Sequence, residues 1–294
     1  MTDTASLSFT PVRADDDALR AYGALFSACF PGVSKFTPAY LRWLYADNPD
    51  GAACGFDAWD GTRLAAHYVC VPGIAEIGGA PVRVLLSLNT ATHPDYQGKG
   101  LFTKLAALTY ERAAGQGYDA VYGVANANST PGFIRKLGFQ LVRPLEARLG
   151  IGGISVRPPS QPAAAGFERV RSPAALAWRC ANPDNPVSMR RRGKVWQFAA
   201  PALSGTCAYA ELALPAGHWQ IASPTAAATA SGWSPLRLYL GLVPDATRNF
   251  STYISIPQRL RPSPLNLIYR SLSGRVAQLD PAAICFSFLD FDAY

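Results

Sequence analysis

The sequence from residue 87 to residue 139, SLNTATHPDYQGKGLFTKLAALTYERAAGQGYDAVYGVANANSTPGFIRKLGF, decides the fold. A β-branched and leucine-rich run ends at His93-Pro94, and a helical pattern begins at Leu101. Between them lie Gly98 and Gly100, which allow the backbone to turn its N–H groups toward one point at the positive end of the helix. The stretch therefore predicts a strand, a glycine loop and a helix that together suit a phosphate or diphosphate.

The sequence after the glycine loop predicts a crossover unit. A helix over Leu101–Gly115 has one row of leucines and ends at a glycine. The run Ala120–Val124 predicts a strand beside the one that ends at Thr92. A short helix over Pro131–Leu137 and a strand over Phe139–Leu149 complete this part of the chain.

The sequence before residue 87 predicts two helices and an antiparallel sheet. A strand over Leu7–Val12 precedes a helix that opens with the acidic residues Asp15–Asp17. A second helix opens at Thr37-Pro38, a capping residue followed by proline. Strands joined by the turns Asp60-Gly61 and Gly78-Gly79 are expected over Cys54–Trp59, Leu64–Val71 and Val82–Thr92.

The composition indicates a globular chain of about two domains. It has 294 residues, 49% of them hydrophobic, and a formal net charge of +7. The positive charge favours an anionic ligand, but 16% charged residues is low for a protein that binds nucleic acid, so we expect no nucleic-acid partner. Six scattered cysteines without a C-x-x-C motif indicate reduced core thiols.

The N-terminal residues MTDTASLSFTPVRADDD include acidic side chains and no long apolar run, so they do not predict a secretory signal. No stretch approaches the ~18 uninterrupted apolar residues of a membrane-spanning helix. We therefore expect a cytoplasmic protein without a membrane partner.

Three landmarks in this region occur in a fixed order. Gln97, Gly100 and Phe102 lie in the glycine loop, His93-Pro94-Asp95-Tyr96 comes just before it, and Lys136-Leu137-Gly138-Phe139 follows the next strand. Their order and spacing resemble the GNAT N-acetyltransferase superfamily, whose fingerprint is Arg or Gln, two residues, Gly, one residue, then Gly or Ala. Phe102 replaces the small residue at the last position. The resemblance covers about residues 5–150.

The resemblance implies a GNAT-like mixed α/β sheet and an acyl-CoA as co-substrate, either acetyl-CoA or another short acyl-CoA. The CoA pyrophosphate is expected on the backbone of Gln97, Gly98, Lys99, Gly100, Leu101 and Phe102. Because the fourth and fifth strands separate in this family, the pantetheine arm is expected along Ala91, Thr92 and His93, with its amides at Asn126 or Asn128 and Ser129. The simpler role of Asn126 and Ser129 is to cap the following helix. No metal is expected.

Acyl transfer to an amine requires that the ammonium group lose a proton and that the thiolate gain one. The tyrosine that usually serves as the acid in this family would stand four residues before Gly138, where this chain has Ile134. His93, which ends the strand before the loop, and His67, one strand over, are therefore the candidate catalytic residues. Their simpler roles are a strand-end residue and a satisfied core residue, respectively.

The second half of the chain looks like a decayed copy of the first. After a linker over residues 151–166 that is rich in Gly, Pro, Ser and Ala, the segment Ala174–Pro183 echoes Tyr40–Pro49. Strands are expected near Trp196–Ala199, Cys207–Leu212, Trp219–Ile221 and residues 284–294, and helices near Ser234–Gly241 and Pro264–Leu272. No glycine loop recurs. We expect a catalytic domain over residues 1–150 and a degenerate GNAT-like domain over residues 167–294.

One complete and one degenerate domain resemble bacterial acyltransferases that modify nucleotide-linked amino sugars for polysaccharide biosynthesis. The expected acceptor is therefore a small-molecule primary amine, and first of all such an amino sugar. Trp43, Asp47 and Asn48 are the expected acceptor contacts, unless they only pack a helix on the sheet, and Asp290 or Asp292 is a further candidate. The alternatives are another small amine or a peptide as acceptor, or a non-catalytic acyl-CoA-binding module. A homodimer is compatible with each of them.

Overall fold

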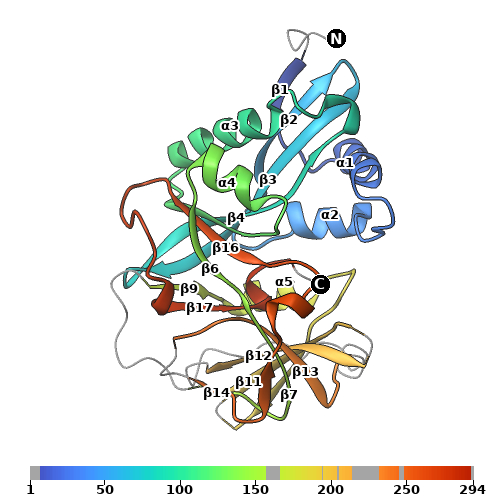
Figure 1. Cartoon of the computed structure of the whole chain (residues 1–294). Coiled ribbons are helices and arrows are strands. Elements are labelled where there is room, and N and C mark those ends of the chain that lie inside the picture. Colours follow the sequence, from blue (N-terminus) through green and yellow to red (C-terminus); the bar gives the residue numbers. More distant parts are fainter. Residues whose placement is uncertain are drawn as a thin grey trace.

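The computed structural model describes residues 7–156, 166–193, 195–203, 205–213, 232–244 and 248–292. In these residues one mixed sheet of 15 strands runs through the molecule, and helices cover both faces of its N-terminal part (Figure 1). The predicted mixed α/β class is thereby confirmed. All six cysteines are free, and four of them are buried.

The N-terminal part of the sheet has the strand order β1-β2-β3-β4-β5-β16-β6. Its strands from the first half of the chain are β1 (Leu7–Pro11), β2 (Cys54–Asp60), β3 (Arg63–Ile77), β4 (Ala80–Thr92), β5 (Ala120–Ala125) and β6 (Gln140–Pro144). Strands β1 to β4 are antiparallel, whereas β4 and β5 are parallel. The predicted hairpins and the predicted crossover unit are therefore confirmed.

Two helices cover each face of this part of the sheet (Figure 1). They are α1 (Asp16–Cys29) and α2 (Pro38–Tyr45) on one face, and α3 (Leu101–Gly115) and α4 (Thr130–Leu137) on the other. The side chain of Asp15 accepts the N–H of Ala18 at 3.0 Å, and that of Thr37 accepts the N–H of Tyr40 at 3.2 Å. These bonds satisfy N–H groups that a helix leaves unpaired in its first turn, so both helices begin where the sequence predicts.

The C-terminal part of the sheet repeats the same plan. Strands β10, β11 and β12 are antiparallel, and β12 runs parallel to β13 as β4 does to β5. Strands β9 and β17 pair with each other and connect this part to β3 and β13. The bounds are β9 (Phe167–Val170), β10 (Ser188–Arg192), β11 (Val195–Pro201), β12 (Thr206–Ala213), β13 (Leu236–Leu242), β15 (Tyr253–Ser255) and β17 (Ile284–Ser287), beside a separate pair of β8 (Ser155–Val156) and β14 (Arg248–Asn249).

Each half of the chain supplies one strand to the sheet of the other half. β16 (Asn266–Ser271) lies between β5 and β6 and is antiparallel to both. In return, β7 (Glu146–Ile151) lies between β13 and β15. Neither part of the sheet is complete without a strand from the other half. The predicted domain boundary near residue 150 stays a prediction, and these two strands cross it.

The helices that echo each other in the sequence lie against each other. The rings of Trp178, in α5 (Pro173–Cys180), and Trp43, in α2, stack with centroids 4.7 Å apart. The indole N–H of each tryptophan donates to the backbone carbonyl of the other, at 2.9 Å and 2.8 Å. Ser172 caps α5 as Thr37 caps α2. The contact is reciprocal, as a two-fold relation between the halves requires.

Two predicted helices in the second half are wrong. The segments Ser234–Gly241 and Pro264–Leu272 contain the strands β13 and β16 instead. β13 is buried on both faces after Leu236, and β16 is buried on both faces from Asn266 to Tyr269, so each contains a mostly apolar run. The period of such a run does not distinguish a buried strand from a buried helix.

Smaller differences concern the ends of strands. The predicted strand Phe139–Leu149 is two strands, β6 and β7, which turn into different parts of the sheet. The predicted last strand stops at Ser287, whose side chain accepts the N–H of Leu289 and starts a 3-10 turn over Phe288–Asp290. The strands expected near Trp196–Ala199 and Cys207–Leu212 are confirmed as β11 and β12, and the one at Trp219–Ile221 lies outside the described residues.

Candidate active site

The glycine loop between β4 and α3 has the conformation that the sequence predicts. Gly98 and Gly100 have φ values of 75° and 74°, which residues with a side chain rarely adopt. A Cβ atom added at either glycine would meet nothing within 4 Å, so the space over the loop is open. Among the described residues, the N–H groups of Gly98, Gly100 and Leu101 have no acceptor. These donors lie at the positive end of the 15-residue helix α3 and form an anion cradle.

Phe102 does not crowd the loop, although it departs from the family fingerprint. Its ring turns into the core between α3, α4 and the sheet, where its centroid lies 5.2 Å from that of Phe133 and 6.0 Å from that of Tyr68. The main chain of the loop is therefore free to bend around a ligand. Ile134, at the position of the usual tyrosine, packs against the same core cluster.

Strands β4 and β5 part directly before the loop. Their parallel pairing starts at Val84 and Ala120 and ends at Ser87 and Gly123. Beyond this point β4 has a bulge: His67 pairs with Ala91 and Val69 with Leu88, so one residue of β3 faces two residues of β4. Asn89, one of these two, has a φ of 46° and is the only described residue other than glycine with a positive φ. The structure therefore has the strand separation that the resemblance implies.

The other residues predicted to bind CoA lie around this separation. Ala91 is buried, and Thr92 ends β4. Asn126 follows β5, and its side-chain oxygen accepts the N–H groups of Asn128 at 3.0 Å and of Ser129 at 2.9 Å. Asn126 therefore closes the turn that leads into α4, whereas Ser129, at the N-cap position of that helix, makes no capping hydrogen bond with its side chain. Because β4 and β5 are parallel, the turn lies at the same edge of the sheet as the glycine loop.

His93 lies at the start of the glycine loop in a local network. Its Nδ1 accepts the N–H of Asp95 at 3.2 Å and so caps the 3-10 turn Pro94–Tyr96. The guanidinium of Arg63 lies 3.0 Å from its Nε2 and donates to the Asp95 carboxylate at 2.8 Å. The side chain is 19% exposed, so solvent or a ligand can reach it.

His67 lies on the opposite side of the sheet from α3 and is fully buried. Its Nδ1 is 2.6 Å from a carboxylate oxygen of Asp57, and its Nε2 is 3.1 Å from the hydroxyl of Tyr45. Asn89 in turn donates its Nδ2–H to the Tyr45 hydroxyl at 3.2 Å. Burial raises the pKa of Tyr45 far above its ordinary value. Each of these groups is hydrogen-bonded, and together they connect the interior to the bulge in β4.

The sequence analysis missed Asp57, Tyr45 and Asn89. One signal was available, because asparagine is disfavoured in strands and Asn89 stands inside a β-rich run, as residues of bulges do. No feature of the sequence indicated that Asp57 and Tyr45 lie next to His67. Asp57 faces His67 only because β2 and β3 contain a bulge next to Ala58, which shifts their pairing.

The predicted acceptor residues have different environments. Trp43 and Asn48 are buried, and Asp47 is exposed. Asn48 donates its side-chain N–H to the carbonyl of Pro72 at 2.9 Å and accepts the N–H of Asp50 at 3.1 Å, so it fixes the turn after α2. Trp43 stacks on Trp178 and lines a cavity.

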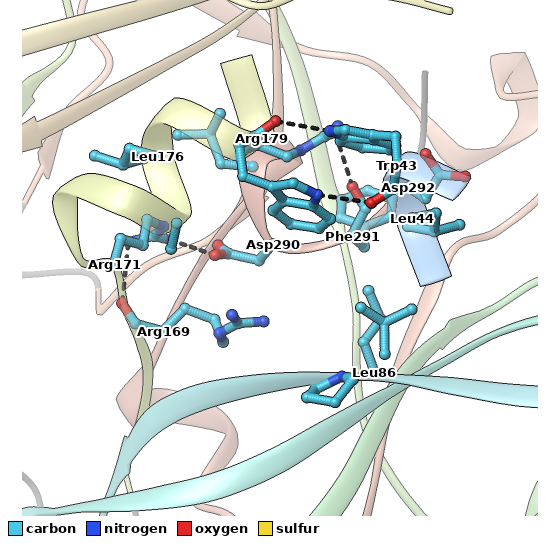
Figure 2. A pocket seen from close by; sticks show the side chains of 15 residues that line it. Trp43, Leu44, Leu86, Arg169, Arg171, Leu176, Arg179, Asp290, Phe291 and Asp292 are labelled. Atoms are coloured by element: carbon cyan, nitrogen blue, oxygen red, sulfur yellow. Dashed lines mark hydrogen bonds and ion pairs between the residues drawn. The ribbon is translucent and has the colours of Figure 1, made fainter. Parts of the chain in front are cut away.

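This cavity of about 50 Å³ lies between α2, α5, β4 and the C-terminal segment (Figure 2). Leu86, which pairs with Tyr122 one step before β4 and β5 part, lines it from the sheet. Figure 2 shows Arg169 extending toward Leu86, and Arg171 joined to Asp290 on the α5 side. The cavity therefore adjoins the strand separation. Arg179 and Asp292 also line it, so its wall has three arginines and two aspartates.

No group of His, Cys, Asp and Glu side chains in the described residues has the arrangement of a metal site. A search of the same residues finds no helix that is long and apolar enough to span a membrane.

Comparison with known proteins agrees with this geometry. Residues 12–142 match the family model described as an acetyltransferase (GNAT) domain. No curated protein sequence matches the chain. Among solved structures, a probable N-acyltransferase from Enterococcus faecalis has 11% identity and a TM-score of 0.58, and the match covers 91% of this chain and 73% of that one.

Two further structures cover the chain to a similar extent. A GCN5-related N-acetyltransferase from Kribbella flavida has 12% identity and a TM-score of 0.58 over 93% of this chain and 73% of its own. Another, from Anabaena variabilis, has 14% identity and a TM-score of 0.55 over 90% of this chain and 73% of its own. At such identities the likeness concerns the fold. Residues 12–142 are therefore similar to a GNAT acetyltransferase domain, and the chain shares its fold with solved proteins described as GCN5-related N-acetyltransferases.

Proposed function

We propose that this protein is an acyl-CoA-dependent N-acyltransferase that moves an acetyl or short acyl group from CoA to a primary amine. One observation carries the proposal: the N–H groups of Gly98, Gly100 and Leu101, at the start of α3, have no acceptor among the described residues and lie in the loop that follows the place where β4 and β5 part. Such a cradle suits a diphosphate, and the separated strands leave room for an extended arm.

In this proposal the CoA pyrophosphate lies on the backbone from Gln97 to Phe102. The pantetheine arm extends the sheet beside Ala91–His93, since β4 has no partner on its β5 side after Ser87 among the described residues. Asn126 and Ser129 follow the carboxyl end of β5, at the same edge of the sheet as the glycine loop. In this proposal they contact the amides of the pantetheine arm. The domain over residues 1–150 holds the cofactor, and residues 167–294 form the degenerate GNAT-like domain.

The proposed reaction is a direct attack of the amine on the thioester in a ternary complex. An ammonium group has no lone pair, so the site must remove a proton before the C–N bond forms. His93, at the entrance of the strand separation, and His67, behind the bulge in β4, are the proposed proton-transfer residues. The C–S bond then breaks, and the CoA thiolate takes up a proton.

The proposed acceptor is an amino sugar carried on a nucleotide. Support comes from the formal net charge of +7, because an excess of positive charge favours an acceptor with phosphate groups. The cavity of about 50 Å³ next to the strand separation has room only for the amino end of such an acceptor. Trp43 lines this cavity, and the exposed Asp47 lies at the end of the same helix. Another small amine or a peptide is the alternative acceptor.

Calorimetric titration with acetyl-CoA and an assay of thiol release test the proposal. We expect binding at one site, and one equivalent of free thiol for each acylated nucleotide-linked amino sugar. Binding without thiol release, for amino sugars, polyamines and peptides alike, would indicate the non-catalytic acyl-CoA-binding module. The absence of binding would refute both functions.

Gly100→Ala tests the loop itself. We expect its affinity for acetyl-CoA to fall by about 10-fold, because Ala disfavours the positive φ that aims the N–H groups. Gly61→Ala is the matched control: Gly61 also has a positive φ, of 58°, and open space around it, but lies in the turn between β2 and β3. Equal affinities of the two variants would show that the pyrophosphate binds elsewhere.

A further inference from the structure

A chain of hydrogen bonds connects a buried carboxylate to the bulge at the proposed acyl-transfer site. It runs from Asp57 in β2 through His67 in β3 and Tyr45 in α2 to Asn89 in β4. Asp57, His67 and Tyr45 are each at most 1% exposed. Asn89, at the bulge, is partly exposed. The four residues come from four different elements, yet they form one continuous path.

The direction of the protons along this path follows from the partners. The Asp57 carboxylate accepts hydrogen bonds, so the His67 Nδ1 at 2.6 Å carries a hydrogen and Nε2 is left as an acceptor. The Tyr45 hydroxyl therefore donates to Nε2 and accepts from the Asn89 amide. A second tyrosine, Tyr22 in α1, donates to the other Asp57 oxygen at 2.7 Å. A proton that reaches Tyr45 from the bulge side can thus be passed to His67.

Stability alone gives little reason for this cluster. A buried, charged cluster often contributes no more to stability than apolar residues of the same volume would. Asn89, where the path ends, is held at a φ of 46°, and residues strained in this way concentrate at functional sites. The burial of the polar groups of the network therefore costs free energy of folding, and Asn89, at the strand separation, has a strained backbone conformation.

We propose that His67 is the proton acceptor of the acyl transfer and that the Tyr45 hydroxyl connects it to the acceptor amine. This inference rests on the proposed function and deepens it. In this proposal the Asn89 side chain turns away from Tyr45 when the acceptor binds, and the ammonium group takes its place. The ammonium proton then moves to the Tyr45 oxygen while the Tyr45 proton moves to His67 Nε2. The resulting imidazolium is paired with the Asp57 carboxylate. The free amine then attacks the thioester carbon.

The remaining protons balance as follows. When the C–N bond has formed and the C–S bond breaks, the nitrogen loses a second proton to the CoA thiolate. His67 returns its proton to solvent along the same path after the products leave. The charged and titratable groups that face the cluster are Asp57 from β2, Tyr22 from α1 and Tyr45 from α2, and Asp292 of the C-terminal segment acts on Tyr45 at longer range. Of these groups, the Asp57 carboxylate, 2.6 Å from Nδ1, is the one that pairs with the imidazole when it carries the second proton.

Tyr45→Phe is the first test, because it removes only the hydroxyl. We expect kcat to fall by about 100-fold, in the range of general acid–base effects, with unchanged affinity for acetyl-CoA. Tyr110→Phe is the matched control. Tyr110 is also a buried tyrosine with a hydrogen bond, to Tyr68 at 2.6 Å, but it belongs to α3, on the other face of the sheet. The control variant should retain the kcat of the unmodified protein.

The dependence of kcat/KM on pH is the second test. His67 must be neutral to accept a proton, so kcat/KM should decrease in acid, and His67→Asn should lose this acidic limb. The asparagine amide still donates to Asp57, which guards against an unpaired carboxylate. If the His67 variant does not fold, the Tyr45→Phe variant still tests the path.

The outcomes separate this inference from the proposed function. A Tyr45→Phe variant with the kcat and the acidic limb of the unmodified protein would refute the path through Tyr45 while acyl transfer stands. A loss of acetyl-CoA affinity in Tyr45→Phe equal to its loss of kcat would show a structural role instead. Failure of the unmodified protein to acylate any amine would overturn both proposals.

Discussion

The two halves of the molecule share a strand plan but differ in what their sheets enclose. The first half has the glycine loop and a buried path from Asp57 to the bulge at Asn89. In the second half, Gln197 and Tyr209 both donate to Glu211, and Arg237 lies over the ring of Tyr209. Among the described residues, this second network contains no histidine, and the exposed Arg190 donates to Gln197 at 2.9 Å.

The sequence of the β12–β13 connection agrees with this difference. Residues 214–231, which lie outside the described part of the chain, contain one glycine and no glycine pair. The comparison teaches that the second half shares the strand plan of the first, although its sequence has no glycine pair like that of the loop. The second half then contributes mainly a strand, a helix face and part of a cavity wall to the first.

Separating the halves should have the largest effect. A fragment of residues 1–152 lacks β16 between β5 and β6, so we expect it not to fold cooperatively, as measured by circular dichroism and amide NMR spectra. The strand edges left open would favour aggregation. Co-expression with residues 153–294 is the control and should restore acetyl-CoA binding. A folded fragment that binds acetyl-CoA by itself would show that the halves are independent.

Asp290→Asn should have the next largest effect. The Asp290 side chain is 1% exposed and forms an ion pair with Arg171, which is 9% exposed, at the junction of the halves. Removing one charge leaves a buried guanidinium unpaired, so we expect the free energy of unfolding to fall by about 3–5 kcal/mol in urea titrations. Asp17→Ala, which removes the exposed pair with Arg20, is the control and should cost less than about 0.5 kcal/mol. Equal losses would mean that the buried pair is not needed.

Substitutions of Trp43 and Trp178 test whether the contact between α2 and α5 is symmetric. Trp43→Phe and Trp178→Phe each remove one of two equivalent hydrogen bonds, so we expect similar losses, about 1–2 kcal/mol each. The double variant should lose less than the sum by about 1 kcal/mol, because the two side chains stack. Clearly unequal single losses would argue against a two-fold relation. Thermal unfolding of all three variants gives the comparison.

The capping residues of α1 and α5 should have smaller effects on Tm, and only the effect of the α1 cap should depend on pH. The hydrogen bond from the Ala18 N–H holds the pKa of Asp15 below its ordinary value of 3.8. Its charge therefore stabilises α1 fully above that ordinary pKa, and the effect disappears as the pH falls through the lowered one. Asp15→Asn keeps a capping side chain but should flatten the dependence of Tm on pH in acid. Ser172→Ala, in α5, should lower Tm equally at every pH.

Local pattern allowed prediction of the elements around the loop. The glycines at 98 and 100, the leucine row of α3 and the capping residue Thr37 specify their structure through nearby residues, and each was predicted correctly. The hydrogen-bonded path through His67 could not be predicted from residues that are near one another in the sequence. In a regular hairpin with the Asp60-Gly61 turn, Asp57 would pair with Ala66, and only the bulge at Ala58 brings His67 opposite it.

The C-terminal half was predicted less well for a related reason. The apolar runs of β13 and β16 are buried between neighbours that come from other parts of the chain. Which strand lies beside which depends on the assembled sheet and not on the period of a single segment. The sequences of β7 and β16 by themselves therefore do not show that these strands pair with the other half of the chain.

The exchanged strand also has a consequence for synthesis of the protein. A nascent chain emerges from the ribosome with β5 and β6 long before residues 266–271, which must enter between them. Until then the sheet that holds the glycine loop has two open edges, and its closure depends on contacts between residues far apart in the sequence, which form slowly. If the protein has the proposed function, acyl-CoA will bind during translation only after β16 has been made.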